Sequence, residues 1–121
     1  MSTKAISSLS PLEEAVEAAR AKKALEIVAL DLREVADFTD HFLICSGTSG
    51  RQVQAIADEI ERRLRLSGLR PAHIEGYNRA EWLLMDYVDL VIHIFSERAR
   101  SFYDLERLWR TARRVPVDAA S

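Results

Sequence analysis

Residues 80–95 read AEWLLMDYVDLVIHIF, a stretch that predicts a β-hairpin with two different faces. Successive side chains along a strand point to opposite sides of a sheet. If Asp86 faces Asp89 across a turn at Tyr87-Val88, the face expected to be core comprises Leu83, Met85, Leu90, Ile92 and Ile94. The opposite, mixed face comprises Trp82, Leu84, Asp86, Asp89, Val91, His93 and Phe95. Such a mixture of aromatic, aliphatic and charged side chains suits a surface that docks onto a partner.

The remaining sequence carries signals for three helices and three further strands. Ser10, Pro11 and Glu13 supply the N-cap, the first-turn proline and the capping-box acid of a helix over about 10–23. A second helix begins after the turn Gly47–Gly50, since apolar residues recur at helical spacing until Gly68. The other expected elements are strands over 25–30, 41–46 and 71–75 and a helix over about 97–110.

The order of these elements predicts an α/β (α+β) fold in which helices flank a mixed five-stranded sheet. A chain of 121 residues is the usual size of a single domain, which is expected to cover residues 10–110. Residues 1–9 are expected to form a disordered N-terminal tail. Residues 111–121 are expected to form a flexible C-terminal tail.

Composition excludes several classes of function. The formal net charge of −2 argues against a protein that binds nucleic acid irrespective of sequence, because such proteins are normally basic. Arginine supplies 14 of the 17 basic residues, which favours bidentate contacts or reflects the composition of the host genome. No segment has the roughly 18 apolar residues of a membrane span, and residues 1–10 do not read as a signal peptide, so we expect a cytoplasmic protein.

Neither a metal nor a disulfide is expected. Cys45 is the sole cysteine, and its apolar neighbours indicate a buried, unreactive thiol. No two histidines stand at the spacing of zinc ligands. His93 is a lone histidine on a strand, which is more often a hydrogen-bonded structural residue than a general base.

An ordered series of motifs identifies a family. The motif residues are Asp40, Phe42–Cys45, Gly47-Thr48-Ser49, Glu75-Gly76, Ala80-Glu81-Trp82, Asp86, Asp89, His93, Arg100 and the run YDLERLW at 103–109. Together they resemble the ribosomal silencing factor (Iojap-like) family. The resemblance implies a nucleotidyltransferase-like fold without known catalysis and without a cofactor. It also implies docking onto protein fourteen of the large ribosomal subunit, which would repress translation by keeping the small subunit from joining, notably when nutrients are scarce.

The resemblance and the mixed face together give the expected contact residues. The resemblance assigns partner contact most strongly to Trp82 and Tyr103. Leu84 is their expected neighbour, and the acidic residues expected to face a basic ribosomal protein are Asp86, Asp89, Glu75 and Glu106. On the residues alone, a tryptophan such as Trp82 is more often core than a contact residue, and Asp86 and Asp89 are more often turn formers than metal ligands or a catalytic pair.

The last helix also bears on this surface. Phe102, Leu105 and Trp109 are expected to lie along one face of it. Tyr103 lies about 160° around the helix from Leu105, which predicts that it points away from the core.

Two other classes of function remain. A minimal nucleotidyltransferase-like enzyme would use the turn Gly47–Gly50, because helix N-termini attract anions. Asp86 and Asp89 straddle a turn, however, so they lack the alternation that would point two carboxylates at one pair of metal ions. A homodimer of the free protein, paired through the mixed face, is the third possibility.

Overall fold

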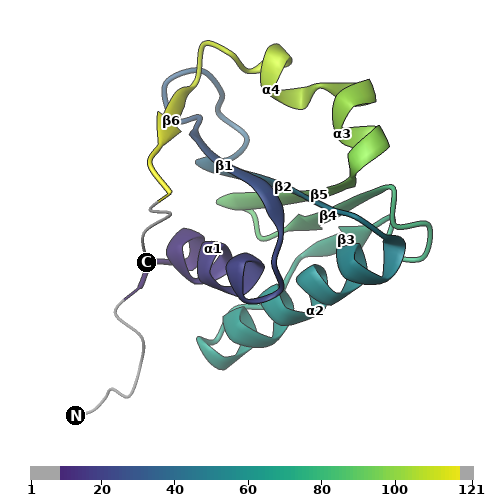
Figure 1. Cartoon of the computed structure of the whole chain (residues 1–121). Helices are drawn as coiled ribbons and strands as arrows, with labels where there is room; N and C mark the ends of the chain where they lie inside the picture. The colour runs from purple at the N-terminus through teal and green to yellow at the C-terminus, as the bar shows by residue number, and fades with distance from the viewer. Residues whose placement is uncertain (1–8, 118–121) are drawn as a thin grey trace.

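The computed structural model describes residues 9–117, and Figure 1 shows its sheet between two pairs of helices. The strands are β1 (Leu25–Asp31), β2 (His41–Gly47), β3 (His73–Glu75), β4 (Trp82–Asp86), β5 (Leu90–Ser96) and β6 (Arg113–Val115). Their order across the sheet is β3-β4-β5-β2-β1-β6, and only β2 and β5 run parallel. The predicted α/β fold with a mixed sheet is confirmed, with six strands where five were expected.

Two helices, α1 (Pro11–Ala21) and α2 (Gly50–Leu66), cover one face of the sheet (Figure 1). The predicted capping box of α1 is present, with the Ser10 hydroxyl and the Glu13 carboxylate each accepting a backbone N–H of the other residue. The face of the hairpin that we expected to be core lies under these helices. Its residues are at most 4% exposed: Leu83, Met85, Leu90, Ile92 and Ile94.

The hairpin register differs from the expected one by two residues. Asp86 lies opposite Val91, not opposite Asp89, so the connection is longer than the expected two-residue turn. Val88 has a φ of 75°, and the Asp86 carboxylate accepts its backbone N–H at 2.8 Å. A type I′ turn would need positive φ at both Tyr87 and Val88, whereas the longer connection needs it at Val88 but not at Tyr87. The shift preserves which residues share each face.

The second pair of helices, α3 (Glu97–Tyr103) and α4 (Leu105–Leu108), covers the opposite face. The single helix expected over 97–110 is therefore wrong, because Asp104 adopts a left-handed conformation with a φ of 48° and ends α3. The break separates the residues expected to share an apolar face. Leu105 is buried, whereas Phe102 is 77% exposed.

The end of the described chain also differs from expectation. Arg113–Val115, within the segment 111–121 predicted to be flexible, pairs antiparallel with β1 as strand β6. Arg113 donates to the Asp31 carboxylate at 3.3 Å, and the adjacent Ala112 is buried. Three residues with two adjacent charges give too weak a pattern to predict a strand. Residues 1–8 and 118–121, which hold the rest of the two expected tails, lie outside the described part.

Candidate functional site

Trp82 lies at the border between core and surface. Its side chain is partly buried, and its indole N–H donates to Nδ1 of His93 at 3.0 Å. One side of the indole packs on Phe95, with ring centroids 5.1 Å apart. Another side contacts Tyr103 at 4.6 Å. Trp82 is therefore half core and half surface, and it unites the two interpretations that its sequence left open.

The β5 part of the mixed face is core, which corrects the expectation that this face docks as a whole. Val91, His93 and Phe95 are at most 8% exposed because α3 and α4 pack across them. Alternation along a strand tells which residues share a face, but it does not tell what covers that face. Only the β4 side of this face, with Trp82 and Leu84, remains partly exposed.

His93 is a structural residue of this second core. It is 4% exposed, and burial lowers the pKa of its imidazole to about 4. A neutral ring is needed here, since Nδ1 must accept the indole N–H of Trp82. The Phe42 ring meets the imidazole edge-on, with centroids 4.5 Å apart. The expectation of a hydrogen-bonded structural histidine is confirmed.

A hollow of about 620 Å³ opens beside the Trp82–Tyr103 pair. It is lined by Gly76, Arg79, Glu81, Trp82, Arg98, Ala99, Phe102 and Tyr103. The exposed Phe102 ring meets Tyr103 edge-on at 5.0 Å, and Tyr103 is 46% exposed. We call this set of residues the aromatic hollow. Rigid aromatic rings at the mouth of a concavity are the usual anchors of a protein interface.

The sequence analysis missed the arginines and Phe102 of the aromatic hollow. Phe102 was expected to share a core face with Leu105, but the left-handed Asp104 ends α3 between them and separates the two side chains. Arg79 and Arg98 had no motif to mark them. The sequence feature that could have pointed to them is the general excess of arginine over lysine, which the composition of the host genome also explains.

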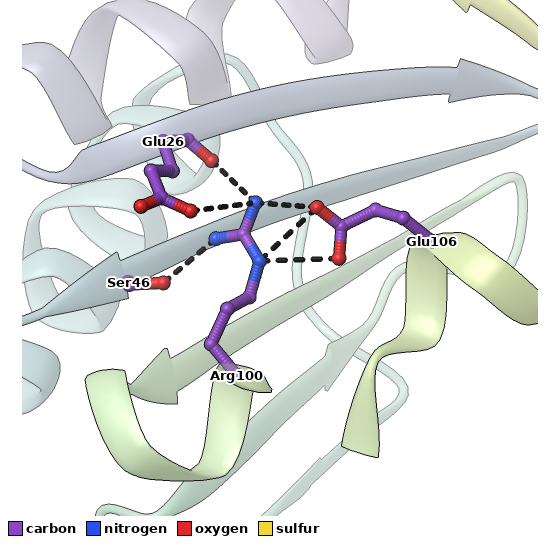
Figure 2. Close-up of polar contacts among 4 residues, drawn as sticks. All are labelled: Glu26, Ser46, Arg100 and Glu106. Carbon is purple, nitrogen blue, oxygen red and sulfur yellow. Dashed lines mark hydrogen bonds and ion pairs between the residues drawn. The ribbon is translucent and has the colours of Figure 1, made fainter. Parts of the chain in front are cut away.

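A buried arginine holds the two short helices against the sheet (Figure 2). Arg100 is 7% exposed, and its guanidinium donates to Ser46 Oγ at 2.7 Å, to the Glu26 carbonyl at 2.7 Å and to Glu106 at 2.8 Å. Glu26 has a φ of 49°, and the pairing of β1 with β2 is irregular beside it. We call these four residues the arginine clasp. It links β1, β2, α3 and α4 through a single guanidinium.

Glu106 belongs to this clasp and not to an exposed acidic patch. Burial alone would raise the pKa of its carboxyl group, but the hydrogen bonds and charge of Arg100 outweigh burial and lower the pKa. Both of its oxygens accept from the guanidinium. This carboxylate is therefore occupied inside the protein, unlike the solvent-facing partner contact that we expected.

The other acidic residues lie at the β3 edge and in the hairpin connection. Glu75 stands directly opposite Leu84 in the pairing of β3 with β4, and Asp86 stands opposite His73. Residues opposite one another point to the same side, so Glu75, Leu84 and Asp86 share a face with Trp82. Asp89 is exposed in the connection. Glu75, Asp86 and Asp89 form an acidic border, which is separated along the sheet from Trp82 and the aromatic hollow.

The turn Gly47–Gly50 is built as a helix cap. Ser49 accepts the backbone N–H of Gln52 at 3.1 Å. The side-chain oxygen of Gln52 accepts both the backbone N–H and the hydroxyl of Thr48. The side-chain amide nitrogen of Gln52 donates to the backbone carbonyls of Lys22 and Lys23. The Thr48 N–H and hydroxyl are thereby occupied within the protein.

Nothing within residues 9–117 forms a cluster of three or more His, Cys, Asp or Glu side chains that could hold a metal ion. Cys45 is fully buried, and burial raises the pKa of its thiol to about 12, as expected for an unreactive cysteine. None of the described helices has the length and apolar character needed to cross a bilayer.

The sequence model of the family described as "Ribosomal silencing factor during starvation" matches residues 5–121. The chain belongs to the ribosomal silencing factor family. A relative named ribosomal silencing factor from Halalkalibacterium halodurans is 41% identical over 107 residues, which cover 88% of this chain and 92% of that protein. A crystal structure from Chromobacterium violaceum has a TM-score of 0.81 and 30% identity, covering 90% of this chain and 89% of that one.

A more distant relative is the mouse protein named "Mitochondrial assembly of ribosomal large subunit protein 1". It is 31% identical over 93 residues, and the match covers 74% of this chain but only 41% of the mouse protein. These relatives bear the names of ribosomal factors.

The structure of this silencing factor explains the run of residues that ends its motif series. In Tyr103-Asp104-Leu105-Glu106, Asp104 breaks the helix, Leu105 enters the core and Glu106 closes the clasp on Arg100. Tyr103 faces outward and its ring contacts that of Trp82. Three residues of the run hold the fourth in place.

Proposed function

We propose that this silencing factor docks onto the large ribosomal subunit by binding protein fourteen of that subunit, and that it represses translation in the cytoplasm. Bound there, it occupies space that the small subunit needs for joining. The observation that carries the proposal is the exposed Trp82–Tyr103 pair at the mouth of a hollow of about 620 Å³. Membership in a family of silencing factors and the name of the mouse relative support a large-subunit partner.

The mechanism requires no catalytic group, because a body of this size excludes a second body by occupancy alone. Standard protein interfaces bury about 800 Å² on each partner, so docking would involve surface around the aromatic hollow as well as the hollow itself. Glu75 and Asp86 extend the surface along β4 with negative charge. Charge of this sign steers approach to a basic ribosomal protein and orients the complex.

The test substitutes Tyr103 with glutamate and measures co-sedimentation with purified large subunits, together with binding to isolated protein fourteen. Trp82 is the poorer probe, because its loss would also remove the hydrogen bond to His93. The matched control is Leu66→Glu, at a residue 75% exposed near the end of α2. We expect Tyr103→Glu to abolish both binding reactions and the block of subunit joining, and Leu66→Glu to leave them intact. Normal binding by folded Tyr103→Glu protein would contradict the proposed surface.

A further inference from the structure

Charge is unevenly distributed along the chain. Residues 97–115 carry six arginines against three acidic residues, whereas the rest of the chain carries 11 basic and 16 acidic residues. The segment that forms α3, α4 and β6 is thus positive on an otherwise negative protein. The overall charge of −2 does not reveal this uneven distribution of positive and negative residues. A negative overall charge therefore does not exclude contact between this positive segment and nucleic acid.

Three of these arginines are available to a partner, and one of them is Arg114, which is exposed and forms no ion pair within residues 9–117. Arg100 is buried in the clasp, Arg98 lies 3.8 Å from Glu81, and Arg113 binds Asp31. Arg107 and Arg110, by contrast, are exposed, and neither forms an ion pair with any residue of the described part of the chain.

Arg107 and Arg110 line a second hollow, of about 570 Å³, which shares Phe102 and Tyr103 with the aromatic hollow. Its lining residues are Phe102, Tyr103, Asp104, Arg107, Leu108, Arg110 and Thr111. Phe102 and Leu108 are 77% and 74% exposed. We call this the arginine hollow. It combines unpaired guanidinium groups with exposed aromatic and aliphatic surface.

This combination fits RNA better than an acidic protein surface. Guanidinium groups bind phosphates in a bidentate manner and stack on bases, and an exposed aromatic ring offers a platform for an unpaired base. Carboxylates of a protein partner would satisfy the charges, but they would offer the Phe102 ring no planar group on which to stack.

We infer that the arginine hollow contacts the phosphate backbone of ribosomal RNA, with Arg107 and Arg110 on phosphates and Phe102 against a base or ribose. The inference rests on the proposed docking to the large subunit, whose proteins are embedded in RNA. Phe102 and Tyr103 line both hollows, so the two hollows would engage protein and RNA side by side. The contact reads no sequence, because phosphates position a protein without specifying bases.

The experiment compares Arg107→Gln/Arg110→Gln with the control Arg65→Gln/Arg70→Gln. The control removes the same charge from exposed residues at the end of α2 and just beyond it. Affinity for whole large subunits is measured from about 50 to 200 mM salt, and affinity for isolated protein fourteen is measured in parallel. Thermal unfolding checks that all variants are folded.

We expect the Arg107/Arg110 variant to bind large subunits about tenfold more weakly and to reduce the slope of log affinity against log salt by about 2. Binding to isolated protein fourteen should match that of the control. A photoreactive residue in place of Leu108 should crosslink to RNA.

Three outcomes would overturn the inference. An affinity and salt slope equal to those of the control would show that the arginines contact nothing charged. Equal weakening toward subunits and isolated protein fourteen would assign these arginines to the protein partner. Failure of the wild-type protein to bind large subunits would overturn the proposed function as well, whereas the first two outcomes leave that function standing.

Discussion

The two faces of the sheet are held in different ways. Beneath α1 and α2, the side chains from β4 and β5 are wholly apolar, and none is more than 4% exposed. Beneath α3 and α4, the core includes His93 and Arg100, each hydrogen-bonded to a partner. The first face is an ordinary hydrophobic core formed with two regular helices. The second holds two short helices whose own apolar surface is small.

The difference shows how docking residues are positioned. Apolar contacts do not depend strongly on direction, so they tolerate small shifts of a short helix. Hydrogen bonds from one guanidinium to β1, β2 and α4 allow little shift, because each bond requires its own geometry. The arginine clasp thereby adds directional contacts to the apolar packing of this face, and it holds Tyr103 against Trp82.

The largest expected effect is the loss of the arginine clasp. Arg100→Met leaves the Glu106 carboxylate partly buried and unpaired, which should lower the free energy of unfolding by about 3–5 kcal/mol in urea denaturation. Ile92→Ala on the other face should cost a similar 2–5 kcal/mol through a cavity. Adding Glu106→Leu should restore much of the loss in Arg100→Met and none of it in Ile92→Ala. Equal instability of the Arg100→Met single and double variants would show that the clasp acts by packing alone.

The second prediction concerns His93 and pH. Its folded-state pKa of about 4 lies below the value of 6.5 for an exposed imidazole, so between these values the unfolded chain binds more protons. Stability should therefore fall as pH decreases from about 6.5 to about 4, by about 3 kcal/mol. His93→Gln keeps an acceptor for the Trp82 indole without titrating, and it should remove this part of the pH dependence. The same slope in both proteins would mean that His93 is not the group responsible.

The apolar face was predictable from sequence, and the polar face was not. Alternation over 80–95 identified Leu83, Met85 and Ile92 as core without error, because burial of one whole strand face leaves a periodic pattern. The clasp depends on Arg100 meeting Ser46 and Glu26, which are 54 and 74 residues away in the chain. No local pattern records such a meeting.

The candidate site was predicted in part for the same reason. Trp82 and Tyr103 were found through the family motifs, and the structure places their rings in contact. Glu106 was misplaced because its motif shows that it matters without showing which partner it has. Phe102 was misplaced because a helical wheel assumes an unbroken helix, and Asp104 breaks it.

A third prediction tests the support beneath Trp82. Gly76 has a φ of 78°, and a Cβ there would lie 2.2 Å from the Trp82 carbonyl oxygen. Gly68 also has a positive φ, of 89°, but a Cβ there would meet no atom within 4 Å. Gly68→Ala should therefore cost about 1 kcal/mol from backbone strain, and Gly76→Ala about 1–3 kcal/mol because β4 must also shift. Only Gly76→Ala should weaken binding to large subunits; equal effects of the two variants on binding would contradict this support.

The smallest effect on stability is expected at Phe102, an exposed residue of α3 that we compare with Leu66, an equally exposed residue of α2 on the other face of the sheet. Phe102→Ser removes a ring that is 77% exposed, so the free energy of unfolding should change by no more than about 0.5 kcal/mol. Leu66→Ser, at a residue 75% exposed on α2, should be equally mild. In a large-subunit binding assay the two should separate, because Phe102 lines both hollows and Leu66 lines neither. If Phe102→Ser instead bound as well as Leu66→Ser, the exposed aromatic surface held in place by the clasp would have no part in docking.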